Sequence, residues 1–193
     1  MTGPTASGFI DPSEILQGLA GRQVVEVRYH VPVEVAGGRV SDSGMVDDVE
    51  QAIDLMVDDG SVVRAQWEMR GELEFLSVVR ASGTDLIGSF VDTVDVSGGD
   101  SWGRILGRTV SGVGVAWHAS GSEELRAPFA IRLDFHGATS VVIALGELVG
   151  GVPSYLPDGV LVIFDETVAA NYVFPGAESP AWGIPIGKDM RPG

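Results

Sequence analysis

Alternation of apolar and polar residues dominates the chain and predicts a protein made mainly of β-strands. The clearest run covers residues 23–35, where apolar residues occupy every second position, as expected for a strand with one buried face. Pro32 within this run predicts an edge position or a bulge. Further strands are expected at residues 62–67, 73–79, 129–135 and 160–164. The last of these is apolar throughout, which indicates a central strand buried on both faces.

Short helices are expected ahead of two of these strands. The segment Asp11-Pro12-Ser13-Glu14 combines a capping residue, a proline suited to the first helical position and an acidic residue. It predicts a helix that Gly21 ends in the left-handed conformation. A second short apolar segment follows the cap candidates Asp100 and Ser101, and a helical turn is expected from Val168 to Tyr172.

The second half of the sequence repeats the order of the first. Gly21-Arg22-Gln23-Val24 is echoed by Gly107-Arg108-Thr109-Val110, and a short apolar segment behind a cap candidate precedes each. Three further matches keep the same order: Ile53–Val57 with Ile131–Phe135, Ser61–Val63 with Ser140–Val142, and Gly71–Leu73 with Gly146–Leu148. A conserved order of matches is typical of an old duplication. Chance similarity among common residues is the alternative.

The repeat also bears on residues 46–57, which fit two patterns. Val49, Ile53 and Met56 have helical spacing, whereas residues 53, 55 and 57 alternate as in a strand. Periodicity alone does not decide between them. The matching residues 129–135 alternate without a helical phase, so we expect a strand at Ile53–Val57.

The predicted fold class is therefore α+β, mainly β. We expect two related antiparallel β-meander units, each with a short leading helix, packed as one pseudo-symmetric body. Two separate domains are the alternative, but the short link with its own strand-like residues favours one body. The expected segments are a flexible N-terminus at 1–10, a first β-rich unit at 11–80, a linker with a possible strand at 81–98, a second β-rich unit at 99–166, and a short helical turn with a Pro-rich tail at 167–193.

The charge of the chain narrows the range of partners. Asp and Glu number 27 against 12 Lys and Arg, which gives a formal net charge of −15 at pH 7. Because nucleic-acid binding depends on a basic face, we expect no nucleic-acid partner. The acidity fits a protein that binds a basic protein, and it equally fits a protein that is merely kept in solution by its charge.

Composition also bears on location. The chain contains no cysteine, which excludes disulfides, thiolate zinc sites and cysteine nucleophiles. Its longest apolar stretch is well short of the roughly 20 residues that a spanning helix needs. The first residues lack the basic and apolar pattern of a secretory signal. We expect a cytoplasmic protein without membrane association.

No motif in the sequence identifies a function. The candidate site residues are two histidines near strand ends and the two Glu of the repeated Gly-Glu-Leu, namely His30, His118, Glu72 and Glu147. Together they would suit an acid–base or metal site between the two units. None of the spacings typical of metal sites or nucleophile elbows accompanies them. Surface histidines and glycine bulges explain the same residues, so we expect no cofactor and no metal.

Two functions remain. The favoured hypothesis is a non-enzymatic acidic protein-interaction module, like the immunity and antitoxin proteins that neutralise a basic toxin through complementary charge. The alternative is a small ligand-binding or hydrolytic domain with a pocket between the two units. Formation of a homodimer through the Pro-rich tail is compatible with either function.

Overall fold

The computed structural model of the protein describes residues 11–33, 44–71, 73–82, 91–119, 126–137, 140–155 and 158–172. Over these residues the protein is mainly β, with antiparallel sheets and a few short helices. The helices are α1 (Ser13–Gln17), α2 (Asp100–Gly103) and α3 (Glu166–Asn171). The strands are β1 (Val24–Pro32), β2 (Val46–Asp48), β3 (Ala52–Val57), β4 (Val62–Arg70), β5 (Leu73–Ala81), β6 (Val91–Asp95), β7 (Val110–Ala119), β8 (Arg126–Phe135), β9 (Val141–Leu145), β10 (Glu147–Val149), β11 (Val152–Ser154) and β12 (Val160–Ile163).

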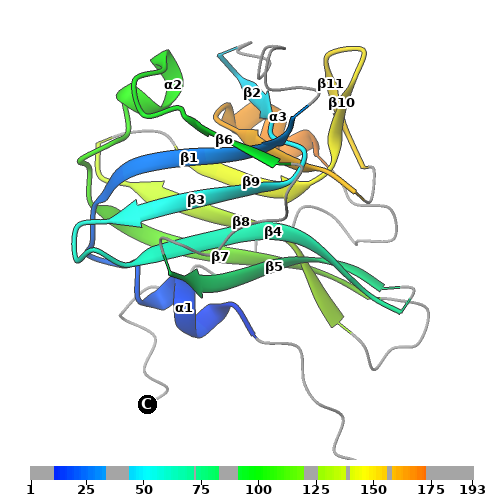
Figure 1. Ribbon diagram of the computed structural model, residues 1–193, viewed down its shortest axis with the longest axis horizontal. Coiled ribbons are helices and arrows are strands. Elements are labelled where there is room, and N and C mark those ends of the chain that lie inside the picture. Colours follow the sequence, from blue (N-terminus) through cyan, green and yellow to red (C-terminus); the bar gives the residue numbers. More distant parts are fainter. Residues whose placement is uncertain are drawn as a thin grey trace, which may run out of the picture.

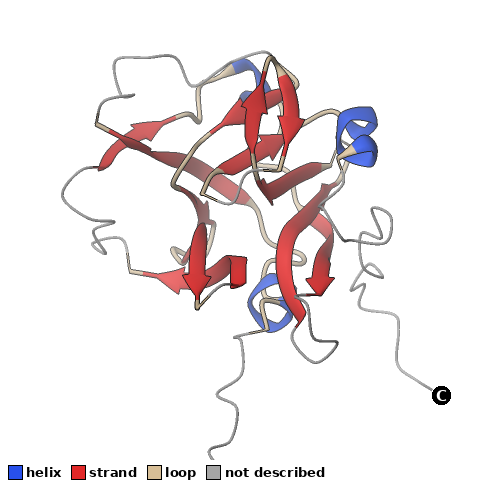
Figure 2. Ribbon diagram, turned by 90° about the vertical axis from the view of Figure 1, so that its right-hand side faces the viewer, coloured by secondary structure: helices blue, strands red, loops and turns tan. Residues whose placement is uncertain are grey.

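The strands form two five-stranded sheets and one separate hairpin. The first sheet has the order β5-β4-β3-β1-β6, and the second has the order β2-β12-β9-β8-β7. In Figure 1 the first sheet lies in front of the second, and Figure 2 gives the same strands after a quarter turn. The strands β10 and β11 make the hairpin, which extends from the upper right of the body in Figure 1.

One hydrophobic core joins the two sheets, since the buried apolar residues of both belong to a single cluster. Alternation along β1 follows the pleat of a strand. Val27, Tyr29 and Val31 point into the core, whereas Arg28 and His30 lie on the opposite face of the first sheet. β12 is buried along its whole length between β9 and β2, so the prediction of a central strand there is confirmed.

The starts of β1 and β7 pair with each other and connect the two sheets. Gly21 donates its backbone N–H to the carbonyl of Val110, and Gly107 donates to the carbonyl of Val24, each over 2.9 Å. An isolated antiparallel bridge between residues 23 and 109 lies between these bonds. Both glycines have positive φ, 83° and 75°, a backbone conformation that glycine adopts at little cost. The chain therefore enters both sheets through equivalent turns.

The two sheets also share their connectivity and an irregularity. Each sheet contains four neighbouring strands whose order in the sheet follows their order in the sequence. These strands are β1-β3-β4-β5 in the first sheet and β7-β8-β9-β12 in the second. A register shift follows Val24, which faces Val57 of β3, and another follows Val110, which faces Phe135 of β8. These pairs correspond to the sequence matches noted above.

Several predicted elements are confirmed. Residues 52–57 form strand β3 and not a helix, and β6 provides the strand expected in the linker. The helical turn expected near Val168 is α3, whose N-cap Asp165 accepts hydrogen bonds from the backbone N–H groups of Thr167 and Val168. The N-terminus at 1–10 and the tail after residue 172 lie outside the described residues.

The capping predictions are wrong in detail. Pro12 and not Asp11 is the N-cap of α1, although Asp11 still accepts a backbone hydrogen bond from the first turn. Gly99 is the N-cap of α2, and neither Asp100 nor Ser101 caps that helix with its side chain. The side chain of Ser101 is buried within the helix instead.

Two strand predictions are corrected as well. Pro32 does not mark an edge or a bulge, because β1 is an interior strand and the proline is its last residue, a position where a missing N–H is tolerated. Residues 46–48 were not expected to form a separate strand. They form β2, which leaves the first sheet and pairs with β12 in the second.

Two of the sequence matches do not keep their register. Val63 of β4 faces Leu55, and Val141 of β9 faces Leu133, so the match at residues 61–63 is displaced by one position. Gly71 lies in the turn between β4 and β5, whereas residue 146 precedes β10. The two Gly-Glu-Leu segments therefore belong to different elements.

A buried chain of polar side chains crosses the core. The indole N–H of Trp102 in α2 donates to the hydroxyl of Tyr29 over 2.6 Å, and this hydroxyl donates to Asp47 Oδ2 over 2.7 Å. All three residues are at most 6% exposed. The chain links α2, β1 and β2, so it ties both sheets to the helix that precedes β7.

We expect Tyr29→Phe to lower the free energy of unfolding by about 1–3 kcal/mol, because it leaves a buried indole N–H and a buried carboxylate without the hydroxyl that joins them. Urea denaturation monitored by circular dichroism measures the change. Tyr155→Phe is the matched control, since the hydroxyl of Tyr155 also bonds a carboxylate, that of Glu74, but is only partly buried. An equal loss of unfolding free energy in Tyr29→Phe and Tyr155→Phe would show that burial of the polar chain through Tyr29 does not make it more important for stability.

Candidate functional site

The four candidate residues from the sequence do not form one contact network. His30 belongs to a polar network on the outer face of the first sheet, and His118 contacts the backbone of β5. Glu147 begins the projecting hairpin. Glu72 lies outside the described residues. None of the contacts found in the described part of the chain joins two of these side chains.

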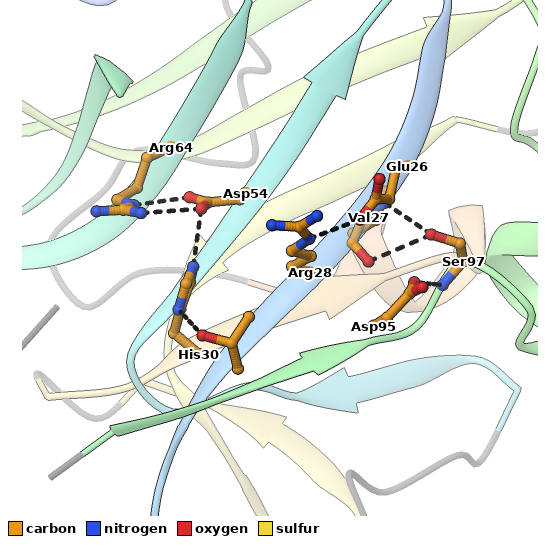
Figure 3. A network of polar contacts seen from close by, with 9 residues as sticks. Glu26, Val27, Arg28, His30, Asp54, Arg64, Asp95 and Ser97 are labelled. Carbon is orange, nitrogen blue, oxygen red and sulfur yellow. Dashed lines mark hydrogen bonds and ion pairs between the residues drawn. The ribbon is translucent and has the colours of Figure 1, made fainter. Parts of the chain in front are cut away.

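The network around His30 lies across four strands of the first sheet. Arg64 of β4 donates two hydrogen bonds to Asp54 of β3, over 2.7 and 2.8 Å. His30 Nε2 lies 2.9 Å from the second oxygen of the same carboxylate, and its Nδ1 lies 3.1 Å from the hydroxyl of Thr93 in β6. Figure 3 shows the chain from Arg64 through Asp54 to His30. Asp54 lies directly opposite Arg64, and His30 lies directly opposite Thr93. His30 and Asp54 are diagonal neighbours on adjacent strands.

Burial makes this network electrostatically strong. His30, Asp54 and Arg64 are each 6% exposed. Burial by itself would raise the pKa of Asp54, but the hydrogen bonds from Arg64 and His30 outweigh it and lower that pKa from 3.8 to about 2. The carboxylate is therefore ionised at neutral pH and pairs with a guanidinium in a bidentate geometry.

The order hydroxyl, imidazole and carboxylate is that of a hydrolase relay. Here Arg64 neutralises the carboxylate through both of its oxygens, which weakens its support for a positively charged imidazole. Neither of the two pockets described below includes Thr93 or His30 in its lining. The arrangement is that of a cross-strand polar ladder, a stabilising element of sheets.

His118 has a structural environment. It is 6% exposed, its ring packs edge-on against Phe129, and its Nε2 lies 2.9 Å from the backbone carbonyl of Glu74. A carbonyl only accepts hydrogen bonds, so Nε2 carries the proton. Burial lowers the pKa of His118 more than the nearby Glu74 raises it. The neutral imidazole thus tethers β7 to β5 across the core.

Carboxylates gather around Glu147 at the base of the projecting hairpin. The pKa of Glu50 is raised by burial and by the negative charges of Asp48, Asp158 and Glu147. Asp48 accepts a hydrogen bond from the backbone N–H of Leu148 over 3.0 Å, which joins β2 to the hairpin. Burial also raises the pKa of Asp48. We call these four acidic residues and the tip of the hairpin the hairpin surface.

The tip of that hairpin is apolar. Val149 and Val152 face each other across the Gly150-Gly151 turn and are 51% and 62% exposed. Both glycines have positive φ, as a tight two-residue turn requires. A hairpin with exposed valines at its tip and carboxylates at its base combines apolar and charged surface, as interaction surfaces do.

Glu50 is also strained in its backbone. Its φ is 67°, the one positive value at a non-glycine residue within the part of the chain described. A side chain at such a position costs the fold about 1 kcal/mol. The same residue experiences repulsion from three neighbouring carboxylates. Strain and repulsion both disfavour a glutamate here for stability alone.

Two pockets adjoin α2 and share Ser101. The larger has a volume of about 400 Å³ and is lined by Gly44, Met45, Ser101, Arg104, Ile105, Arg108, Gly137, Phe164 and Asp165. The smaller, of about 220 Å³, is lined by Asp47, Asp95, Val96, Gly99, Asp100, Ser101 and Trp102. None of the four sequence candidates lines either pocket.

Sequence reasoning missed most of these residues. In the sequence Ser101 has the type and position of a helix cap, and Arg108 is notable only for its match with Arg22. The four carboxylates of the hairpin surface come from separate segments, and no spacing connects them. The one available signal was Glu147, which was chosen for its place in a repeated tripeptide and not for its neighbours.

We expect Asp54→Asn to destabilise the protein by about 3 kcal/mol or more at pH 7, since it breaks a buried ion pair and leaves Arg64 without its partner charge. Asp54 has a folded pKa below its ordinary value, so its contribution is complete above about pH 4 and is lost as the pH falls to about 2. The stability difference between wild type and variant therefore shrinks over this range, by about 2 kcal/mol. Urea titrations from pH 7 to pH 2 measure it.

The matched control is Asp134→Asn in the second sheet. Asp134 also pairs with an arginine, Arg132, but both side chains are about one-third exposed, at 32% and 28%. A surface pair contributes at most about 1 kcal/mol. If both variants lose the same stability, the buried network around Asp54 does not have the role described.

The described residues contain no group of three or more His, Cys, Asp or Glu side chains arranged to hold a metal ion. None of their helices is long and apolar enough to cross a membrane. No family model, curated protein or solved structure matches this chain.

Proposed function

We propose that the protein is a non-enzymatic acidic interaction module that binds a basic protein through the hairpin surface, in the manner of immunity and antitoxin proteins. The observation that carries this proposal is the concentration of Asp48, Glu50, Glu147 and Asp158 at the base of a hairpin whose tip is apolar. Glu50 is repelled by the other three carboxylates in the free protein. A partner that supplies positive charge would relieve the repulsion and bury the valines.

The chemistry of the partner follows from the surface. Lysine or arginine side chains would pair with the carboxylates, and an apolar patch would receive Val149 and Val152. The net charge of −15 adds long-range attraction for a basic protein, which speeds association and makes it sensitive to salt. A partner with these properties fits a protein kept in the cytoplasm, where we place it.

We also propose that the chain consists of two related units, residues 11–80 and 99–166, joined by a linker. Three features support it: the equivalent register shifts after Val24 and Val110, the reciprocal bonds of Gly21 and Gly107, and the shared strand connectivity. The exchange of β2 into the second sheet would have interlocked the two units after the duplication.

A small ligand-binding domain is the second candidate function. One observation favours it, the pocket of about 400 Å³ that residues of both proposed units line. Hydrolysis has less support, because the carboxylate that lies beside His30 and the hydroxyl of Thr93 is neutralised by Arg64. A homodimer remains compatible with either function, and the Pro-rich tail proposed to form it lies outside the described residues.

The hairpin surface is tested by neutralising its four carboxylates together. The variant carries the substitutions Asp48→Asn, Glu50→Gln, Glu147→Gln and Asp158→Asn. Immobilised wild-type protein is expected to retain a basic protein from native lysate at low salt and to release it at high salt, and the variant is expected to retain at least tenfold less. Quantitative mass spectrometry of the eluates measures the difference.

The matched control neutralises four exposed acidic residues elsewhere, with the substitutions Asp11→Asn, Glu14→Gln, Asp92→Asn and Asp100→Asn. It changes the net charge by the same amount and is expected to retain the partner. An equal loss of recovery in both variants would mean that total charge and not the hairpin surface is responsible. Recovery of no basic protein by the wild type would contradict the proposal itself.

Glu50→Gly separates function from stability. Glycine removes the strain at φ 67° and the repulsion from neighbouring carboxylates, so we expect the free energy of unfolding to rise by about 0.5–1 kcal/mol. Partner binding is expected to weaken in the same variant. Glu147→Gln is the control for stability, because it removes a negative charge at a residue that has no positive φ. It relieves repulsion without relieving backbone strain. A destabilised Glu50→Gly protein would show that the glutamate is kept for folding.

A further inference from the structure

The larger pocket is unusual for this chain because arginines line it. Arg104 and Arg108 lie on the turn that leads from α2 to β7, and neither forms an ion pair in the part of the chain that the structure describes. The chain as a whole has 27 acidic residues against 12 basic ones. On a chain with this excess of acidic residues, two arginines without ion pairs in the lining of one pocket are not expected by chance.

Both arginines are held in place by the backbone. Arg104 Nε donates to the carbonyl of Asp100 over 2.8 Å, and Arg108 Nε donates to the carbonyl of Arg104 over 2.7 Å. A terminal nitrogen of Arg108 also donates to the carbonyl of Gly137 over 2.9 Å. The same nitrogen lies 3.4 Å from the carbonyl of His136, and within the described residues no other bond to the terminal N–H groups of the two arginines is found. Fixing a guanidinium in advance reduces the entropy lost when it binds an anion.

Ser101 supplies an independent observation. It lines the same pocket, it is 8% exposed, and its buried hydroxyl has no hydrogen-bond partner. A buried hydroxyl without a partner costs the fold about 1–3 kcal/mol. A ligand with an acceptor oxygen in this pocket would satisfy it, and both guanidinium groups belong to the same lining.

The arginine that precedes β7 has a counterpart in the first sheet, and the two differ in their partners. Arg22 precedes β1 as Arg108 precedes β7, and it lies 4.0 and 3.6 Å from Asp58 and Asp59, in the turn after β3. The turn after β8 has His136 and Gly137 at the corresponding positions. The backbone N–H of His136 donates to the carbonyl of Thr109, just before β7, as that of Asp58 donates to the carbonyl of Gln23, just before β1. The second sheet therefore keeps the arginine and lacks both of its carboxylates.

We propose that this pocket binds a small organic anion whose phosphate or carboxylate group is held by Arg104, Arg108 and the hydroxyl of Ser101. Guanidinium groups match the oxygens of both anions in two-pronged geometry. Ile105 and Phe164 form apolar walls for the rest of the ligand, and Phe164 is fixed by edge-on packing against Trp102, with ring centroids 5.2 Å apart.

One acidic residue lies in the lining and must be considered. Asp165 directs its Oδ1 to the backbone N–H groups of Thr167 and Val168, where it caps α3. Its charge is thus partly engaged by the helix, and the two guanidinium groups outnumber it. The site shares no residue with the hairpin surface, so it does not depend on the proposed interaction with a basic protein.

Isothermal titration calorimetry of the full chain tests the site with four probes: inorganic phosphate, phenyl phosphate, phenylacetate and neutral benzyl alcohol. We expect phenyl phosphate, phenylacetate or both to bind saturably at one site, and benzyl alcohol not to bind. Tighter binding of phenyl phosphate would identify a phosphorylated ligand, and tighter binding of phenylacetate a carboxylate. Because the protein carries −15 charges, general attraction of anions is not expected.

Arg104→Gln and Arg108→Gln are each expected to weaken binding of the preferred probe about tenfold or more, the loss expected for one charge-assisted hydrogen bond. Arg22→Gln is the matched control, since it removes the corresponding arginine of the first sheet and should leave the affinity unchanged. Ser101→Ala is expected to weaken binding without lowering the melting temperature, because the lost hydroxyl has no partner to leave behind.

The proposal is overturned if no anionic probe binds saturably up to about 10 mM, which corresponds to a negligible affinity. It is also overturned if Arg22→Gln weakens binding as much as Arg108→Gln, or if Ser101→Ala binds as tightly as the wild type. Circular dichroism of each variant establishes that the fold is retained, which the exposed positions of all three arginines favour.

Discussion

The antiparallel pairing between the starts of β1 and β7 is the constraint on which the rest of the structure depends. It joins an interior strand of the first sheet to an edge strand of the second through backbone hydrogen bonds, and it needs a left-handed residue at Gly21 and Gly107. Because both strands begin there, the directions of both sheets are set from one point. Their apolar faces then meet in one core, and the turn from α2 to β7 that contains Arg104 and Arg108 is fixed beside it.

Much of the fold could be predicted because its strands obey local alternation. The strand at Ile53–Val57 is predicted only by comparison with residues 129–135, where no helical phase competes, and β3 confirms it. β2 could not be predicted in this way, since three residues have no measurable period and their partner, β12, lies more than a hundred residues later. The prediction of an edge or a bulge at Pro32 was wrong for a related reason. The effect of the proline depends on whether it ends a strand or lies within one, which sequence does not specify.

The candidate sites were less predictable because their chemistry arises from tertiary contacts. His30 and His118 attracted attention as histidines, yet each has an ordinary reason to be where it is, one in a cross-strand ladder and one as a tether between β7 and β5. The carboxylates near Glu50 converge from β2, the hairpin and the segment before β12. Ser101 has the residue type and position of a cap, and only the geometry of α2 reveals that its hydroxyl is unused.

The two proposed sites share a physical property, which is that each lowers the stability of the free protein. At the hairpin surface the energy is stored as like-charge repulsion and as backbone strain at Glu50. At the pocket it is stored in the buried hydroxyl of Ser101, which has no hydrogen-bond partner. The acidic hairpin surface suits a basic protein and the arginine-lined pocket suits a small anion. The two ligands would therefore not compete for one site. In the first sheet the arginine that precedes β1, Arg22, pairs with two carboxylates, whereas His136 and Gly137 follow β8 in the second sheet. A turn of this kind therefore does not require an arginine without carboxylate partners, and we attribute that feature of Arg108 to binding.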